Sequence, residues 1–205
     1  MDQMVNHGTP GERQVQTQLD SQVRAKRFYD RQMRDRLSAK MVELIRRQEM
    51  MFIATSDAHG NCDCSPRFGQ AGFVLVLDDR TLAYPELRGN GVFASLGNIS
   101  ENPHLGLVFV DVFHTTVGLH VNGAAHWYSS TELPSTLAAY LDSEPLHLDS
   151  AVECWVVITI DEAYIHCSKH VPLLEKKDKL IMWGTDDPLA KSDDYFRSNP
   201  EPHTP

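Results

Sequence analysis

The sequence lacks the segments that would carry a protein into or across a membrane. Its longest apolar runs have the length of strands, whereas a membrane-spanning helix needs about 20 apolar residues in succession. The N-terminus is polar and has no apolar core typical of a secretion signal. Cysteine is also scarce, at four in 205 residues. These absences predict a cytoplasmic protein whose thiols are reduced.

A basic excess is missing as well. The chain has 19 Lys and Arg against 28 Asp and Glu, a net charge of −9 and a pI near 5.5. Nucleic-acid grooves and anionic membrane surfaces both require a basic face, so we expect neither as a partner. The charge is uneven, because residues 24–47 are basic and the tail after Thr185 is acidic. Local anion sites can therefore exist within an acidic protein.

The common catalytic and metal-binding signatures are also absent. The chain contains no GxSxG, HExxH, GxxxxGK[ST] or GxGxxG motif, which argues against the familiar hydrolases and nucleotide-binding enzymes. Cys62 and Cys64 form a CxC pair without a second His or Cys pair nearby, so we expect no structural metal. Cys154 and Cys167 lie in apolar strand patterns and are predicted to be small core residues.

A helical region is present near the N-terminus. Residues 12–50 contain neither Pro nor Gly, and apolar residues recur there at spacings of mostly three or four. This pattern predicts a long helix over 14–36 and a second helix capped by Ser38. The long helix is charged and weakly amphipathic, and such helices rarely stand alone. We expect it to pack on a partner subunit or across a barrel end; the alternative is a solvated surface arm.

The rest of the chain is rich in short apolar segments separated by turn residues. The apolar content of 41% is sufficient for a real core. Gly123 indicates a bulge or bend, residues 161–162 a turn, and residues 129–141 a helix. The predicted strands cover residues 51–56, 72–77, 81–84, 105–110, 116–127 and 151–160, with short segments at 62–65 and 163–167 that return from the turns before them. Six or seven strands with short connections predict a mainly β protein, a closed or nearly closed barrel with a long N-terminal helical extension.

These elements suggest a division of the chain into four parts. Residues 1–11 are expected to be flexible, 12–50 to form the helical extension, and 51–170 the barrel. Residues 171–205 form a C-terminal arm, extended after Gly184 and disordered over 199–205.

The most informative stretch runs from Ser65 to Pro103. It contains an unbroken apolar run over 72–77, a turn at 78–80 and a second strand at 81–84, which together predict a β-hairpin. A glycine-rich loop beginning at Arg88 then leads into a short helix. Free backbone N–H groups at a helix start, next to a basic side chain, suit an anion such as a phosphate. Arg67 can supply a second positive contact.

This stretch resembles the pyridoxamine 5'-phosphate oxidase-like, FMN-binding split-barrel family, in particular its actinobacterial-type members of unassigned substrate. The matching pieces follow the family's order over roughly residues 50–170. They include Ser65-Pro66-Arg67, Arg88-Gly89-Asn90-Gly91, Leu119-His120-Val121-Asn122-Gly123 and Tyr164-Ile165-His166-Cys167-Ser168-Lys169. The resemblance implies FMN as cofactor and a homodimer whose sites lie between the subunits.

The resemblance also implies roles for individual residues. The residues implied at the flavin ring are Val74, Leu75, Val76 and Leu77, and those at the phosphate are Arg67, Tyr84, Arg88 and Asn90, with added hydrogen bonds from Ser95 and Asn98. Lys169 would lie near the ring and Trp183 would close over it from the partner. The alternatives are an ordinary barrel core for the apolar four, surface positions for the arginines, a solvated strand end for Lys169 and simple packing for Trp183.

Two departures from the family pattern bear on function. Arg88-Gly89-Asn90 stands where the oxidases proper have Ser-Arg-Lys, and their C-terminal Arg-x-His element is not found, so the vitamin substrate is not expected. The resemblance therefore implies hydride transfer through flavin N5 on an unknown small-molecule substrate. The alternatives are a deazaflavin-dependent reductase and a non-catalytic flavin- or haem-binding module.

Histidines in the late strands are the support for the haem alternative, and they also leave a metal site open. They are His120, His126, His166 and His170. If the last strand continues far enough, alternation places His166 and Ser168 on one side and Cys167 and Lys169 on the other.

Overall fold

The computed structural model describes residues 7–144, 152–183, 185 and 187. The predictions for residues 1–6, for the strand start at 151 and for most of the tail from 184 to 205 lie outside the described residues. In chain order the elements are α1 (Pro10–Gln18), α2 (Gln22–Gln32), α3 (Ala39–Arg46), β1 (Met50–Ser56), β2 (Cys62–Phe68), β3 (Leu75–Asp78), β4 (Thr81–Leu87), α4 (Ala94–Glu101), β5 (His104–Val110), β6 (Gly118–Ser129), α5 (Ser135–Ser143), β7 (Val152–His166) and a 3₁₀ turn, η1 (Ser168–His170).

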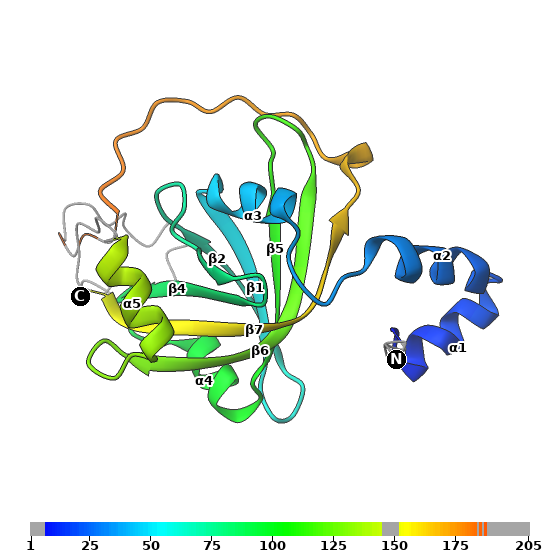
Figure 1. Ribbon diagram of the computed structural model, residues 1–205, viewed down its shortest axis with the longest axis horizontal. Helices are drawn as coiled ribbons and strands as arrows, with labels where there is room; N and C mark the ends of the chain where they lie inside the picture. The colour runs from blue at the N-terminus through cyan, green and yellow to red at the C-terminus, as the bar shows by residue number, and fades with distance from the viewer. Residues whose placement is uncertain (1–6, 145–151, 184, 186, 188–205) are drawn as a thin grey trace, which may run out of the picture.

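The strands form one antiparallel sheet in the order β2-β1-β5-β6-β7-β4-β3. The sheet curls around a core, and its two edge strands, β2 and β3, are not paired with each other (Figure 1). The mainly β, split-barrel prediction is therefore confirmed, with an open sheet rather than a closed one. The predicted hairpin is also confirmed, because Leu75 pairs with Ala83 and Val76 with Leu82.

Two apolar clusters hold the barrel together. The larger one fills the interior and includes Ile45 from α3, Met51 from β1 and Phe109 from β5, all 0% exposed. The smaller one packs α5 against the sheet through Leu137, Trp155 and partners. Residues 73–76 are all buried, which explains their unbroken apolar run, but β3 begins only at Leu75 and not at the predicted Gly72.

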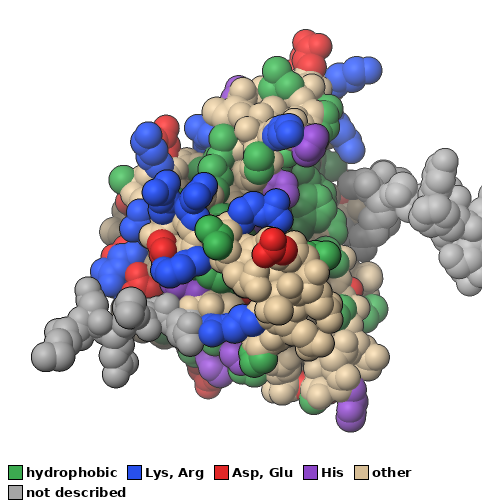
Figure 2. Space-filling view, turned by 90° about the vertical axis from the view of Figure 1, so that its right-hand side faces the viewer, with side chains coloured by type: hydrophobic (Ala, Val, Ile, Leu, Met, Phe, Trp, Pro, Cys, Tyr) green, Lys and Arg blue, Asp and Glu red, His purple; other side chains and the backbone are tan. Residues whose placement is uncertain are grey.

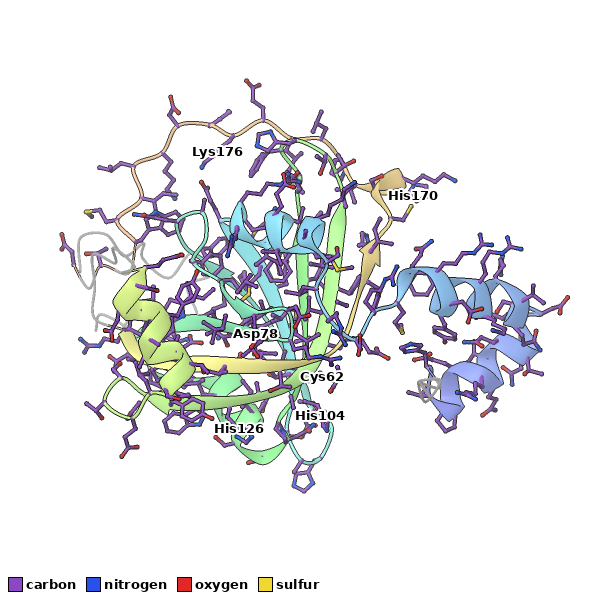
Figure 3. All side chains as sticks on the ribbon, viewed as in Figure 1. Cys62, Asp78, His104, His126, His170 and Lys176 are labelled. Carbon is purple, nitrogen blue, oxygen red and sulfur yellow. The ribbon has the colours of Figure 1, made fainter. Side chains whose placement is uncertain are left out.

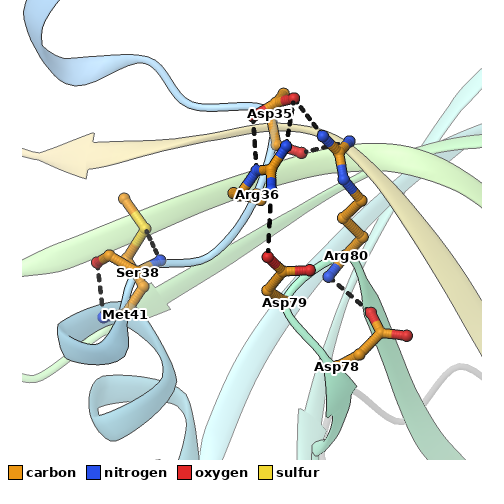
Figure 4. Close-up of polar contacts among 7 residues, drawn as sticks. All are labelled: Asp35, Arg36, Ser38, Met41, Asp78, Asp79 and Arg80. Atoms are coloured by element: carbon orange, nitrogen blue, oxygen red, sulfur yellow. Dashed lines mark hydrogen bonds and ion pairs between the residues drawn. The ribbon is translucent and has the colours of Figure 1, made fainter.

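The sequence prediction of the helical region is partly wrong. The expected helix over 14–36 is two helices, because the chain turns at Asp20, which adopts a left-handed φ of 47°. The predicted cap is confirmed, since Ser38 Oγ accepts a hydrogen bond from Met41 N at 3.4 Å (Figure 4).

Two further boundaries differ from the prediction. No turn occurs at 161–162, because β7 continues to His166 as one strand. Asn122 pairs with Glu162 and Gly123 with Ile160, so Asp161 is the extra residue of a bulge, as the predicted bend at Gly123 requires. The helix expected over 129–141 begins at Ser135, since β6 extends to Ser129 and Pro134 then precedes the helix.

The two N-terminal helices form an arm beside the barrel (Figure 1). Backbone bonds between Arg34 and Ala163, and an ion pair between Asp35 and Arg80 (Figure 4), attach it to the sheet. Figure 2 looks at this side of the molecule and shows Lys and Arg side chains gathered there; α2 contributes exposed Arg24, Lys26, Arg27 and Arg31. None of the described helices is long and apolar enough to cross a membrane.

Candidate cofactor site at the barrel split

Four polar side chains meet where the barrel is open, and we call them the split cluster: Asp63, Arg67, Glu86 and Ser95. Arg67 on β2 donates from Nε to Glu86 Oε2 on β4 at 3.0 Å, and from Nη2 to Ser95 Oγ on α4 at 3.3 Å. Ser95 Oγ donates to Asp63 Oδ2 at 3.2 Å. The cluster thus joins β2, one edge of the sheet, to β4, next to the other edge.

Burial sets the electrostatics of this cluster. The side chains of Arg67 and Glu86 are 19% and 11% exposed. Burial raises the pKa of Glu86, and the neighbouring Arg67 offsets part of that shift. Cys154 lies opposite Glu86 on β7, and burial raises its pKa to about 11, so this thiol is neutral at pH 7.

Tyr84 adds an unsatisfied polar group beside the cluster. Its side chain is fully buried, and its hydroxyl has no hydrogen-bond partner among the described residues. Burial also raises its pKa, so the phenol stays protonated. A buried hydroxyl without a partner is unusual and costly, and therefore marks a place where a bound group can make a further hydrogen bond.

The start of α4 adds a favourable feature for an anion to a cluster that holds one guanidinium and two carboxylates. No side chain caps this end of the helix, and Phe93 before it adopts a left-handed φ of 51°. The first backbone N–H groups of a helix lack partners within it and carry a partial positive charge. Ser95 lies in this first turn and contacts Arg67. The helix start and a guanidinium therefore lie together, as a phosphate requires.

The residues assigned to the flavin ring have a clear packing role. Val74, Leu75 and Val76 are buried in the two apolar clusters, and Leu77 is half-buried. The core interpretation of these side chains is therefore confirmed, and their contact with a flavin stays a prediction. Because β3 is an edge strand, its outer backbone N–H and C=O groups have no strand partner and are the groups that can read a ring edge.

The remaining phosphate-side predictions fall in two places. Arg88 and Asn90 lie in the exposed loop before α4, where Asn90 Oδ1 accepts a hydrogen bond from Val92 N at 3.0 Å. Gly89 and Gly91 adopt φ values of 54° and 76°, which side chains tolerate poorly. Asn98 instead donates to Thr55 Oγ1 at 3.0 Å and fastens α4 to β1.

Lys169 does not join the split cluster within one chain, and the contact of Trp183 with a flavin stays a prediction. Strand β7 ends at His166, so the predicted alternation through Lys169 is wrong, and Lys169 lies exposed in η1. Strand β4, which carries Glu86 of the split cluster, pairs with residues 152–159 in the first half of β7, whereas Lys169 follows the other end of that strand. Trp183 is half-buried in the segment that follows. Cys167 is exposed for the same reason, which corrects its prediction as a core residue, whereas Cys154 is buried as expected.

The four late histidines do not form one site. His120 Nε2 and His166 Nδ1 are 3.0 Å apart, and burial together with His166 lowers the pKa of His120. His126 and His170 lie at separate ends of the molecule (Figure 3). Within the part of the chain that the structure describes, no three His, Cys, Asp or Glu side chains are grouped to hold a metal ion.

Sequence reasoning missed Asp63 and Glu86. Two signals were available. Asp63 and Arg67 are four residues apart in a strand, so alternation puts them on one face. Glu86 is an acidic residue within an otherwise buried strand, a position that requires a partner.

The family assignment follows from this fold and from a family model. The model described as pyridoxamine 5'-phosphate oxidase matches residues 37–167, which is well over half of the chain. The chain belongs to this family. The match begins at Leu37 and so leaves out both helices of the arm. No curated protein matches the sequence.

Solved structures of similar fold come from several bacteria. HupZ from Group A Streptococcus is 23% identical with a TM-score of 0.48, covering 63% of this chain and 93% of its own. HutZ, the haem storage protein from Vibrio cholerae, is 13% identical with a TM-score of 0.42, covering 63% and 94%. The FAD binding protein from Mycobacterium smegmatis is 16% identical with a TM-score of 0.42, covering 65% and 97%.

Proposed function

We propose that this protein binds FMN and is an oxidoreductase acting on a small-molecule substrate through flavin N5. The observation that carries the proposal is the meeting of Arg67 with the uncapped start of α4, in a member of this family. Both features favour a phosphate, and edge strand β3 lies next to β4 in the same wall of the barrel. The buried Tyr84 hydroxyl supplies a further donor.

Bound FMN would supply the hydride chemistry, and the chain's own residues would bind and orient it. Arg67 and the first turn of α4 hold the phosphate. The outer backbone groups of β3 orient the ring. Glu86 positions Arg67 by accepting its Nε–H at 3.0 Å. No side chain of the described residues is assigned a proton-transfer role.

We further propose a homodimer. Phe52 on β1 and Phe68 on β2 are 37% and 51% exposed, near the open edge of the barrel. Large apolar side chains exposed close together favour an interface. The expected result is a particle of twice the 23.1 kDa chain mass by light scattering; a monomer at micromolar concentration contradicts this part of the proposal.

The deciding experiment is an absorbance spectrum of the purified protein followed by FMN titration. We expect the near-ultraviolet and visible bands of an oxidised flavin, whereas a deazaflavin or haem has a different spectrum. Arg67→Ala should raise the dissociation constant for FMN at least about tenfold, because a charge-assisted phosphate contact is lost, and Arg88→Ala should raise it by less. Riboflavin, which lacks the phosphate, is the control. A colourless protein that does not bind added FMN overturns the proposal.

A further inference from the structure

We propose that the cavity between the N-terminal arm and the barrel binds a small protonated amine with an apolar body. The cavity has a volume of about 540 Å³. Its walls come from α1 and α2 on one side and from β6 and β7 on the other, which Figure 1 shows facing each other. The family match begins at Leu37, so the arm side of this cavity lies outside the matched residues.

Aromatic rings form part of the wall. The Phe28 ring stands edge-on to Tyr164, with centroids 5.7 Å apart and planes at 80°, and edge-on to Tyr29 at 6.3 Å and 69°. The His7 and Tyr29 rings, which also line the cavity, lie closer to parallel, with centroids 6.1 Å apart and planes at 28°. The faces of aromatic rings attract cations, and sites built from several of them favour ammonium groups.

Two carboxylates give the cavity its charge. Glu12 from α1 and Glu162 from β7 both line it, and none of the described lining residues is Lys or Arg. Both are held in place: Glu12 accepts from the Tyr29 hydroxyl at 2.7 Å, and Glu162 from Asn122 Nδ2 at 3.5 Å. The basic side chains of α2 lie on the exposed surface, and Arg13 of α1 is directed to the backbone behind the wall, where it donates to the carbonyl oxygens of His7 and Gly8. The two carboxylates are thus the charged side chains that line the cavity among the described residues.

His7 indicates that the bound cation carries N–H groups. Its Nδ1 atom is buried and has no hydrogen-bond partner among the described residues, and it stands 3.7 Å from Glu162 Oε1, beyond hydrogen-bond range. In neutral histidine this atom can accept a hydrogen bond. An ammonium N–H placed between His7 and the two carboxylates satisfies it, whereas a quaternary amine has no hydrogen to donate. Met33, Ala25 and Phe28 would face the apolar body.

The test compares phenethylamine, which is protonated at pH 7, with its neutral counterpart 2-phenylethanol, by calorimetry on the full chain. We expect the amine to bind at least about tenfold more tightly than the alcohol. Equal binding of the two, no binding of the amine, or equal binding of the anion phenylacetate each overturns the proposal.

Conservative variants locate the site. Glu162→Gln and Glu12→Gln should each lower the affinity for the amine by about tenfold and leave the affinity for the alcohol unchanged, since they remove charge while keeping size. The matched control, Glu132→Gln, changes an exposed acid in the β6–α5 connection and should have no effect. Circular dichroism of each variant verifies that the arm is still helical. Folded Glu162→Gln protein with unchanged amine affinity refutes the site.

Discussion

The barrel and the arm differ in how much apolar surface they bury. In the barrel, side chains such as Ile45, Met51 and Phe109 are completely removed from water. Neither arm helix, both of which are fully described, has a buried residue, and Val15, Leu19 and Val23 are 51%, 69% and 76% exposed. Burial of apolar surface therefore stabilises the barrel, whereas a few directional contacts hold the arm.

Those contacts are concentrated on a short segment. Arg34 and Ala163 exchange backbone hydrogen bonds of 3.0 and 2.8 Å, and Asp35 pairs with Arg80. Phe28 and Tyr164 add one ring contact. Elements with little buried apolar surface open locally at low free energy. The comparison thus teaches that the arm can detach while the barrel stays folded, which would abolish the amine cavity and spare the split cluster.

The largest expected effect comes from the barrel core. Phe109→Ala should lower the free energy of unfolding by about 3–5 kcal/mol, because it leaves a cavity at a fully buried position. Val15→Ala, the arm counterpart, should change it by less than about 0.5 kcal/mol. Urea unfolding followed by circular dichroism measures both, and similar losses would break the distinction between the two regions.

The bulge in the barrel wall gives the next largest effect. A Cβ atom added at Gly123 would lie 2.1 Å from the Thr159 carbonyl oxygen, so Gly123→Ala should cost about 2–3 kcal/mol of unfolding free energy. The control is Gly97→Ala in α4, where nothing lies within 4 Å of the new atom. There the higher helix propensity of alanine should stabilise by about 0.5–1 kcal/mol. A tolerated alanine at 123 would show that the sheet can move apart at this point.

A smaller effect concerns the split cluster and pH. Burial raises the folded-state pKa of Glu86 above its ordinary value of 4.5, so the folded state holds the proton more tightly than the unfolded state. Its contribution to the free energy of unfolding should therefore be present at low pH and be lost as pH rises from 4.5 through the folded-state pKa. Glu86→Gln should remove this slope in unfolding measured from pH 4 to 8; an unchanged slope would assign it to other groups.

The smallest effect on global stability is expected at the arm attachment. Hydrogen bonds from Arg36 and Arg80 lower the pKa of Asp35 from 3.8 to about 2 (Figure 4). The contribution of Asp35 to the attachment of the arm is therefore present above pH 3.8 and is lost as pH falls through 2. Asp35→Asn should speed proteolysis between α2 and α3 at pH 7 without changing the unfolding free energy of the barrel. Lys26→Ala, which removes an exposed ion pair within α2, is the control and should leave the cleavage rate unchanged.

Local patterns predicted much of the barrel. The apolar run and turn before Thr81, the Ser38 cap and the bend at Gly123 all depend on residues close together in sequence, and the structure confirms each. The break at Asp20 was missed because the sequence around it has no Gly or Pro; the weaker signals are Asp20 itself, a residue type enriched in the left-handed region, and Ser21 at the N-cap of α2. The continuous β7 was missed because a bulge and a turn have similar residue preferences.

The sequence by itself determined a mainly β barrel, its hairpin and the presence of basic residues beside a helix start, since strand periodicity and capping are properties of neighbouring residues; the split form came from the family resemblance. Only the tertiary structure decided that Arg67 meets Glu86 across the opening and that Glu12 and Glu162 line one cavity. Those pairs are 19 and 150 residues apart, and their approach depends on how the sheet curls and where the arm lies, which no local pattern encodes.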